Sequence, residues 1–244
     1  AISDCTFSVK KGEKIMLCGA SGSGKSTLLR LLKRELSPRG ELSGNITIMG
    51  KDRSELSDRE SAEKIGFVMQ SPDSQTVCDK VSAELAFGLE SFGVKSGEIQ
   101  SRVGEMAAFF GIEPLYDRDI STLSGGQKQL VALCSVMVTD PDILLLDEPT
   151  AQLDPVAARE LLGILDRLNK EMGVTIIIAE HDPEELFDSC DKILYLAKGK
   201  TEFFGTPALT AKYFVENALE GFLPETAKAI AKLCEDLPLN VRQG

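Results

Sequence analysis

One octapeptide constrains the fold of this 244-residue chain more than any other feature: Gly19-Ala20-Ser21-Gly22-Ser23-Gly24-Lys25-Ser26. It matches the phosphate-binding loop pattern at every fixed position. An apolar run from Lys14 to Cys18 precedes it and a leucine-rich stretch follows it, as a strand–loop–helix unit requires. In such a unit the backbone N–H groups converge on phosphate oxygens at the positive end of the helix. The motif predicts a nucleoside triphosphate site; the alternative is a glycine-rich turn that carries Lys-Ser by chance.

Two residues of this loop carry most of its chemistry. The closing lysine of such a loop, here Lys25, reaches the β- and γ-phosphates, and the hydroxyl of the next residue, here Ser26, ligates Mg²⁺. The residues expected to bind the nucleotide are Gly19, Ala20, Ser21, Gly22, Ser23, Gly24, Lys25, Ser26 and Thr27.

Composition argues against several other kinds of site. The net charge is −11 at pH 7 with no cluster of lysine or arginine, which disfavours a nucleic-acid partner. Six scattered cysteines and one histidine predict neither a zinc site nor a disulfide framework, and Cys18 and Cys134 are expected to be buried. No apolar run approaches the ~18 residues of a membrane span, so work at a membrane would need a span from another chain. Because it begins at Ala1 without methionine, the chain is expected to be a fragment, a domain of a longer polypeptide or a processed product.

Apolar periodicity predicts the secondary structure. Strands are expected at 5–10, 14–18, 64–69, 143–146 and 174–179, with a short edge strand at 44–50. Helices are expected at 26–36, 155–172, 207–220 and 224–237, and residues 80–120 are expected to be mainly helical. Asp154 is the predicted N-cap of the helix that starts at Pro155, and Gly173 lies just beyond its end. Strands that alternate with helices and are apolar throughout predict a parallel sheet covered on both faces.

Two carboxylates follow the apolar run Ile143–Leu146, at the carboxyl end of a predicted buried strand. Ligands bind at this end of the strands in open parallel sheets. Asp147 can hold Mg²⁺, and Glu148 can accept a proton from the water that attacks the γ-phosphate. The alternative for Asp147 and Glu148 is a solvated acidic turn, which the neighbouring phosphate loop makes the weaker interpretation.

A family resemblance rests on the pentapeptide Leu123-Ser124-Gly125-Gly126-Gln127. With it the chain closely resembles the ATP-binding cassette (ABC) ATPases, whose defining pentapeptide is the same, and the resemblance covers nearly all of residues 1–206. Ser124 is also the expected N-cap of a helix, and a capped helix start is an anion site. The resemblance implies ATP hydrolysis with ATP and Mg²⁺ as cofactors.

The resemblance also implies roles for single residues. Gln70 matches the glutamine that senses Mg²⁺ and the attacking water, and His181 matches the switch histidine that contacts the γ-phosphate. Asp154 matches the loop that communicates between subunits, although Gln152 stands where the family more often has a small residue. The catalytic residues are then Glu148, His181, Gln70 and Lys25, and the Mg²⁺ ligands are Ser26, Gln70 and Asp147.

A second chain is part of what the resemblance implies. In the family, two cassettes close on each ATP, so that the nucleotide held by the phosphate loop of one also meets the pentapeptide of the other. The residues expected to act in trans are Ser124, Gly125, Gly126, Gln127 and Asp154. The expected partner is a second ABC ATPase, identical or different, or fused in tandem.

The implied fold is that of a P-loop NTPase of the ABC ATPase type. It has a RecA-like parallel-sheet core with an antiparallel β edge, a helical subdomain and a C-terminal helical appendage. The expected division is an ABC ATPase domain at 1–206, with the helical subdomain inserted at about 80–138, and the appendage at 207–244.

A further similarity points to one branch of the family. The stretch Gln70-Ser-Pro-Asp-Ser-Gln75, followed by Val81-Ser-Ala-Glu-Leu-Ala-Phe-Gly, is similar to the ATPases of energy-coupling-factor transporters, which import vitamins, cobalt and nickel. Glu84-Leu85 stands where Asp-Val is usual. This implies a motor subunit at the cytoplasmic face of the membrane, bound peripherally to a transmembrane coupling protein. In this branch the coupling protein lays short helices into a groove beside the loop that carries Gln70. The apolar residues that could shape this groove, or equally form plain helix core, are Val77, Val81, Leu85, Phe87 and Leu89.

Two other functions fit the sequence less well than a transporter: a soluble ABC ATPase and a catalytically inactive regulator. Soluble ABC ATPases acting on DNA commonly carry coiled coils or zinc modules between the phosphate loop and the pentapeptide, but here Lys25 and Ser124 are only 99 residues apart. Those acting on ribosomes usually hold two cassettes in one chain. A catalytically inactive regulator is disfavoured because all the expected catalytic residues are present. The aromatic residue that usually stacks on adenine is expected before Ala1, since Phe7 lies too close to the phosphate loop.

Overall fold

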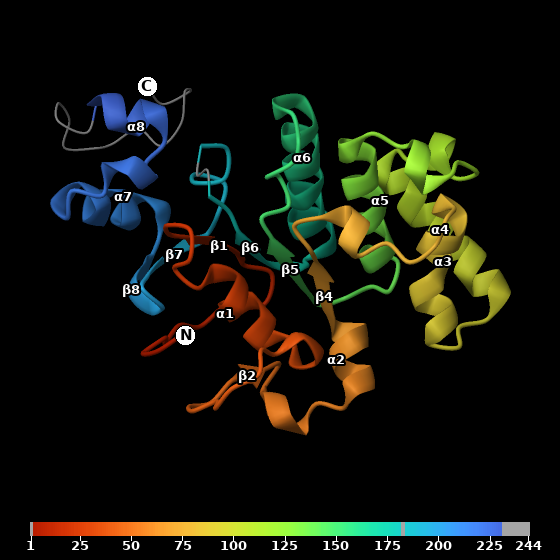
Figure 1. The fold of residues 1–244 in the computed structure, drawn as a ribbon, viewed down its shortest axis with the longest axis horizontal. Helices are drawn as coiled ribbons and strands as arrows, with labels where there is room; N and C mark the ends of the chain where they lie inside the picture. The colour runs from red at the N-terminus through yellow and green to blue at the C-terminus, as the bar shows by residue number, and fades with distance from the viewer. Residues whose placement is uncertain (1, 182–183, 231–244) are drawn as a thin grey trace.

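A six-stranded sheet forms the core of the computed structural model, which describes residues 2–181 and 184–230. Its strands are β1 (Lys14–Cys18), β4 (Ile65–Val68), β5 (Ile143–Asp147), β6 (Thr175–Ala179), β7 (Lys192–Ala197) and β8 (Lys200–Gly205). Their order is β4-β5-β6-β1-β7-β8, and every neighbouring pair is parallel except β7 with β8 (Figure 1). The predicted α/β fold, a parallel-sheet core with an antiparallel edge, is confirmed.

Successive side chains of the central strand pack into two separate layers. Ile15 and Leu17 of β1 join the cluster that includes α1 (Lys25–Leu32), whereas Met16 and Cys18 join the cluster that includes α6 (Pro155–Met172). A parallel strand covered on both faces has no position open to water, so it must be apolar throughout. The continuous apolar runs of β1, β5 and β6 follow from this burial.

The long helix α6 starts and ends where its sequence predicts. Asp154 accepts hydrogen bonds from the N–H groups of Val156 and Ala157, and Pro155 is the first helical residue. Gly173 ends the helix with φ 70°, a left-handed conformation that glycine adopts without steric strain. Both ends are therefore determined by residues next to them in sequence.

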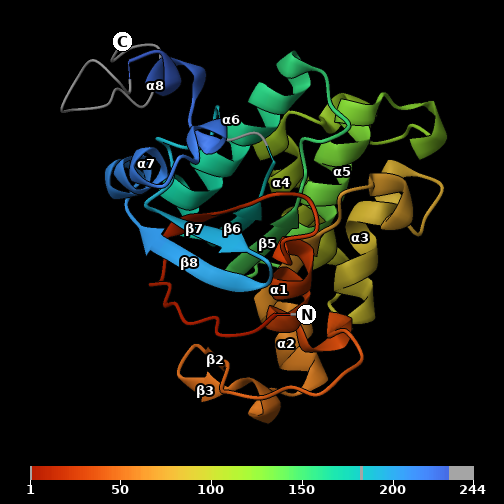
Figure 2. The same cartoon turned by 60° about the vertical axis from the view of Figure 1, so that its left-hand side comes forward.

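Three helices lie together beyond the β4 edge of the sheet (Figures 1 and 2). They are α3 (Val81–Ser91), α4 (Ser96–Phe110) and α5 (Gly125–Met137). The predicted helical character of 80–120 holds to Phe110, after which the short 3₁₀ turns Glu113–Leu115 and Ile120–Thr122 follow. No helix within the described ranges is long and apolar enough to cross a bilayer.

The smaller elements correct one strand prediction. They are α2 (Asp58–Lys64), β2 (Thr47–Ile48), β3 (Lys51–Asp52) and the 3₁₀ turns Arg34–Leu36, Arg53–Glu55 and Pro72–Ser74. The short edge strand expected at 44–50 is present but shorter: β2 covers only Thr47–Ile48 and pairs with β3 in a two-stranded sheet of its own. Met49 (φ 51°) and Gly50 (φ 81°) reverse the chain between them, which ends the extended segment at Ile48.

The strand expected at 5–10 is wrong. This segment has no ladder hydrogen bonds and is held by its side chains, with the Phe7 ring edge-on to Phe204 of β8 at 5.9 Å between centroids. Its alternating apolar residues pack on the α1 side of the core without joining the sheet. Conversely, β7 and β8 were not among the predicted strands, although Lys198 (φ 51°) and Gly199 (φ 82°) between them have the positive φ pair of a tight hairpin.

The C-terminal helices are α7 (Pro207–Glu216) and α8 (Glu225–Ile230), with a 3₁₀ turn at Glu220–Phe222 between them. The predicted helix at 207–220 therefore ends four residues early, and residues 231–237 of the second one lie outside the described ranges. Aromatic rings join α7 to the sheet: Phe214 lies 5.1 Å from Tyr195 of β7, and Tyr213 stacks on Phe203 of β8 at 4.5 Å. The helix α7 thus shares the core of the sheet.

Phe214 is fully buried in this aromatic cluster, so its removal should weaken the whole fold. We expect Phe214→Ala to lower the free energy of unfolding by about 3–5 kcal/mol, because it leaves a cavity among Phe187, Tyr195 and Phe222. Leu209→Ala on the same helix, 57% exposed, should change it by less than about 0.5 kcal/mol. Urea titration followed by circular dichroism measures both; similar midpoints for the two variants would show that α7 is not part of the core.

Candidate nucleotide-binding site

The predicted phosphate loop connects β1 directly to α1, so the nine residues from Gly19 to Thr27 that are expected to bind the nucleotide lie between the end of β1 and the first turn of α1. Two of its glycines are sterically required. A Cβ on Gly19 would lie 2.2 Å from the carbonyl oxygen of Leu196 in β7, and Gly24, the N-cap of α1, has φ 110°. The loop is thus a narrow cradle with its N–H groups at a helix start, where phosphate binds.

The lysine and one serine of the loop have polar atoms suited to an anion. The Nζ atom of Lys25 donates to the carbonyl of Gly19 at 2.8 Å, and this side chain is only 4% exposed. The buried hydroxyl of Ser23 has no hydrogen-bond partner within the described part of the chain. An unpaired buried hydroxyl beside a glycine cradle fits a phosphate group, because its oxygens would supply the missing partner.

The two predicted Mg²⁺ ligands from distant parts of the sequence are neighbours in space. The Ser26 hydroxyl donates to Oδ1 of Asp147 at 2.7 Å. Arg30, one turn further along α1, lies 3.8 Å from Oδ2 of the same carboxylate. Oxygen donors of this kind are those that Mg²⁺ prefers, so the pair fits that ion. Arg30 was not predicted as a site residue, although its i+4 spacing from Ser26 places both on one face of α1.

The predicted base and the predicted sensor glutamine are in contact. Gln70, which follows β4, donates through Nε2 to Oε2 of Glu148 at 3.1 Å, and Oε1 of Glu148 lies 3.8 Å from Lys25 Nζ. Glu148 has φ 48°, a strained value for a residue with a side chain. Its N–H donates to the carbonyl of Ala179 at 2.9 Å, which holds that conformation. The carboxylate therefore lies beside Lys25 of the phosphate loop.

The end of β6 adds a buried carboxylate that was not predicted. Glu180 is 4% exposed and accepts hydrogen bonds from the N–H and the hydroxyl of Thr150 at 3.1 and 2.8 Å. Burial raises the pKa of Glu180 from its ordinary value near 4.5 to about 7. The next residue, His181, is exposed at the carboxyl end of β6. The sequence signal was an acidic residue directly after a buried strand, the same signal that marked Asp147.

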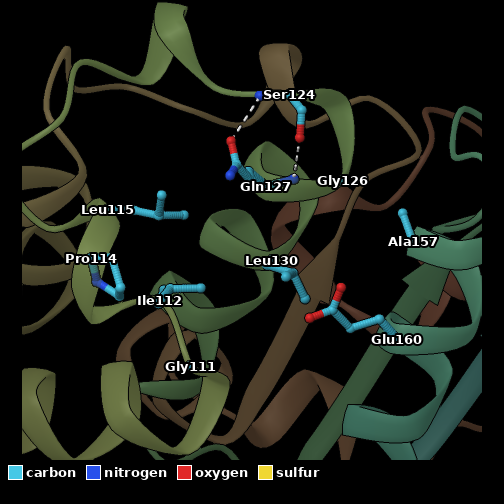
Figure 3. A pocket seen from close by; sticks show the side chains of 10 residues that line it. All are labelled: Gly111, Ile112, Pro114, Leu115, Ser124, Gly126, Gln127, Leu130, Ala157 and Glu160. Atoms are coloured by element: carbon cyan, nitrogen blue, oxygen red, sulfur yellow. Dashed lines mark hydrogen bonds between the residues drawn. The ribbon is translucent and has the colours of Figure 1, made fainter.

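The pentapeptide forms the start of α5 (Figure 3). Ser124 and Gln127 make a reciprocal capping box: the Gln127 N–H donates to the Ser124 hydroxyl at 3.3 Å, and the Ser124 N–H donates to the Gln127 side-chain oxygen at 3.0 Å. A Cβ on Gly126 would lie 2.8 Å from Cβ of Ala157 in α6, so glycine permits the close approach of these two helix starts. Asp154 caps α6 beside them.

A pocket of about 400 Å³ opens beside the pentapeptide, between the start of α5, the start of α6 and the turn that follows α4 (Figure 3). It is lined by Gly111, Ile112, Pro114, Leu115, Ser124, Gly126, Gln127, Leu130, Ala157 and Glu160. None of the hydrogen bonds or ion pairs among the described residues joins the five predicted trans residues to the phosphate loop.

The residues proposed for a docking groove divide into two groups. Val81, Leu85 and Leu89 are buried in the core between α3 and its neighbours, as the alternative of plain helix core requires. Val77 is 66% exposed and Phe87 is 43% exposed. Only these two present apolar surface to a partner.

Comparison with known proteins identifies the family of this site. The family model described as ABC transporter matches residues 2–151, which carry the phosphate loop, the pentapeptide and both carboxylates. The chain belongs to the ABC transporter family. Its predicted identity as an ABC ATPase domain that binds ATP is thereby confirmed.

Relatives and solved structures agree with this assignment. A candidate ABC transporter ATP-binding protein of Bacillus thuringiensis subsp. konkukian is 41% identical over the whole chain, which spans 45% of that relative. One of Methanosarcina mazei is 43% identical over 84% of the chain and 35% of the relative. The chain spans less than half the length of these curated relatives.

Two solved structures match the fold of this ABC ATPase domain. CbiO1 of Clostridium perfringens, described as part of the ABC transporter complex CbiONQ, is 33% identical with a TM-score of 0.79, over 96% of this chain and 92% of that one. The cassette MJ0796, solved as a dimer in a post-hydrolysis state with ADP and phosphate, is 27% identical with a TM-score of 0.73, over 84% and 90%.

The raised pKa of Glu180 gives a pH-dependent contribution to stability. Between about pH 4.5 and 7 the folded chain keeps a proton that the unfolded chain releases, so this contribution is present at low pH and is lost as the pH rises to 7. Glu180→Gln cannot titrate. We expect the melting temperature of Glu180→Gln minus that of the unaltered chain to rise from pH 5 to pH 8. The corresponding change in the free energy of unfolding has an upper limit of about 3 kcal/mol. Thermal melts at each pH measure this, and a constant difference would contradict it.

Proposed function

We propose that this chain is the ATP-binding and ATP-hydrolysing motor of a membrane transporter, of the energy-coupling-factor type that imports a vitamin or a metal ion. The observation that carries the ATPase part is the meeting of Lys25, Gln70 and Glu148 at the carboxyl edge of the sheet. The transporter part is supported by the similarity to CbiO1, a component of an ABC transporter complex.

In the proposed reaction each side chain acts from its observed place. Lys25 and the loop N–H groups hold the phosphates, with Lys25 exchanging its bond to Gly19 for one to phosphate. Glu148 accepts the proton of the attacking water, oriented by Gln70, and His181 contacts the γ-phosphate. Ser26, Asp147 and Gln70 would hold Mg²⁺, which when bound neutralises charge on the phosphates.

The proposal includes a second cassette. Ser124, Gly125, Gly126, Gln127 and Asp154 would complete the site of a partner cassette, since no hydrogen bond or ion pair among the described residues joins them to the chain's own phosphate loop. The Gln127 oxygen is already used in its helix cap, so its amide N–H₂ group is what remains for a nucleotide. The dimeric state of MJ0796 supports this arrangement, and the partner here would be a second ABC ATPase, identical, different or fused in tandem.

The stretch similar to energy-coupling-factor ATPases forms a braced loop. Gln75 accepts from the N–H of Met69 at 2.8 Å and donates to the carbonyl of Phe67 at 3.3 Å, and Asp73 pairs with Lys128 of α5 at 2.7 Å. This loop leads from Gln70 to α3. It supports the proposal because motion at Gln70 would reach the helices on which a membrane partner docks.

The proposed membrane partner is a transmembrane coupling protein at the cytoplasmic face of the cell membrane. It would dock on the exposed apolar residues Val77 and Phe87. Glu84, which stands where the branch usually has aspartate, is buried and accepts from the N–H groups of Val77 and Cys78. The longer side chain of Glu84 therefore still holds this loop by hydrogen bonds.

In the same proposal, residues 1–206 are the ATPase domain with a helical subdomain at about 80–138, and residues 207–244 form the C-terminal appendage.

The role of Glu148 is tested by Glu148→Gln in the full-length protein. We expect ATP hydrolysis to fall by roughly 100-fold or more while ATP stays bound and holds two cassettes together, since the amide cannot accept the proton. Hydrolysis assays and size-exclusion chromatography with ATP measure both effects. The matched control is Glu171→Gln on α6, an exposed glutamate paired with Arg167, which should keep the rate. An unchanged rate in Glu148→Gln would refute the assignment of the base.

The transporter proposal is tested by purifying the tagged full-length protein from membranes in mild detergent. We expect a transmembrane coupling protein and a small substrate-binding membrane protein in stoichiometric amounts. Recovery only from the soluble fraction, with ribosomes or DNA-associated proteins, would favour the alternative of a soluble ABC ATPase and leave the ATPase assignment in place.

A further inference from the structure

Glu180 is a buried carboxylate that the proposed reaction does not use. It follows β6 directly, and its N–H donates to the carbonyl of Leu17, two residues before the phosphate loop. It takes part in none of the ion pairs found among the described residues. Burial of a carboxylate without a cation is unfavourable unless hydrogen bonds compensate for the lost water. The hydrogen bonds that the Glu180 carboxylate accepts therefore indicate its structural role.

Those bonds join two loops of the nucleotide site. Oε1 of Glu180 accepts from the N–H and the hydroxyl of Thr150 at 3.1 and 2.8 Å, and Oε2 accepts from the backbone N–H of His181 at 3.4 Å. Thr150 belongs to the loop that runs from Glu148 to Asp154. One carboxylate thus links that loop to the backbone that carries His181.

The connection continues through the loop to its far end. Ala151 donates its N–H to the carbonyl of Glu148 at 3.2 Å, and Leu153 donates to the carbonyl of Thr150 at 3.0 Å. Asp154 then caps α6. Successive hydrogen bonds make this loop a short rigid unit, so a displacement of Thr150 moves Asp154 as well.

We propose that Glu180 is a positioning residue that keeps the Glu148–Asp154 loop aligned with His181, so that contact of His181 with the γ-phosphate is transmitted to Asp154 and to the partner cassette. This inference rests on the proposed function, in which His181 and Asp154 have those roles. Glu180 itself touches neither nucleotide nor water in this role; it acts through Thr150 and the His181 backbone.

The test measures hydrolysis and nucleotide affinity separately in the full-length protein. Glu180→Ala leaves both donors of Thr150 unpartnered, so we expect kcat to fall roughly 10- to 100-fold through misplacement of Glu148 and Asp154. Affinity for a fluorescent ATP analogue should stay within about threefold, because Lys25 and the phosphate loop do not contact Glu180. Glu180→Gln keeps an oxygen that accepts from Thr150 but places an N–H₂ group, which cannot accept, opposite the His181 N–H, so we expect a loss of kcat smaller than that of Glu180→Ala.

Thr150→Val supplies a milder variant with a matched control. It removes the hydroxyl bond to Glu180 and keeps the N–H bond, so we expect a smaller loss of kcat, with the double variant Glu180→Ala/Thr150→Val no worse than Glu180→Ala alone. The control is Thr175→Val at the opposite end of β6, which removes a buried hydroxyl bonded to the N–H of Gly12 at 2.9 Å. It should leave kcat unchanged.

Normal kcat in Glu180→Ala, or an equal loss in Glu180→Gln and Glu180→Ala, would overturn the inference. If Glu180→Ala fails to fold, the comparison of Thr150→Val with Thr175→Val decides, and equal rates in those two would overturn it as well. Failure of the proposed function has a different result, namely no binding of the ATP analogue by the unaltered protein.

Discussion

The register of three parallel strands fixes the geometry of the whole site. Asp147 of β5 pairs with Ala179 of β6, and Ala179 pairs with Leu17 of β1, so the three strands reach the same edge of the sheet in one row. Glu148 and Glu180 leave the sheet at this edge, and β1 ends one residue after Leu17, at Cys18. A shift by one residue would turn a strand over and separate these groups.

The resulting edge pairs its charges with one another. Asp147 lies beside Ser26 and Arg30, while Glu148 lies beside Gln70 and Lys25. These four side-chain partners thus already make polar contacts within the chain, whereas the Ser23 hydroxyl has no partner among the described residues. Binding of nucleotide then exchanges polar contacts within a preformed site, which requires little rearrangement of the strands.

The helical layers connect this edge to surfaces at a distance from it. The loop after Gln70 is braced on α5 by Asp73 and Lys128 and leads to exposed Phe87 on α3. On the other side, the Glu148–Asp154 loop leads into α6, next to the start of α5. Two outward routes therefore begin at adjacent strand ends, one towards the proposed membrane partner and one towards the proposed second cassette.

Local chemistry made part of this structure readable from the sequence. The phosphate loop, the Ser124 helix cap and both ends of α6 depend on residues within a few positions of one another, and the carboxylates Asp147 and Glu148 needed only the rule that strand ends converge. Long-range contacts needed the tertiary structure. The strand predicted at 5–10 depended on whether a neighbouring edge was free, and the bonds of Arg30 to Asp147 and of Glu180 to Thr150 depended on which strands pair. The division between buried Leu85 and exposed Phe87 also needed the tertiary structure. Periodicity marks apolar residues, but it does not say which of them a neighbouring helix covers. The sequence alone thus determined which chemical groups are present and in which local turns, and the pairing order of the sheet decided which of them meet.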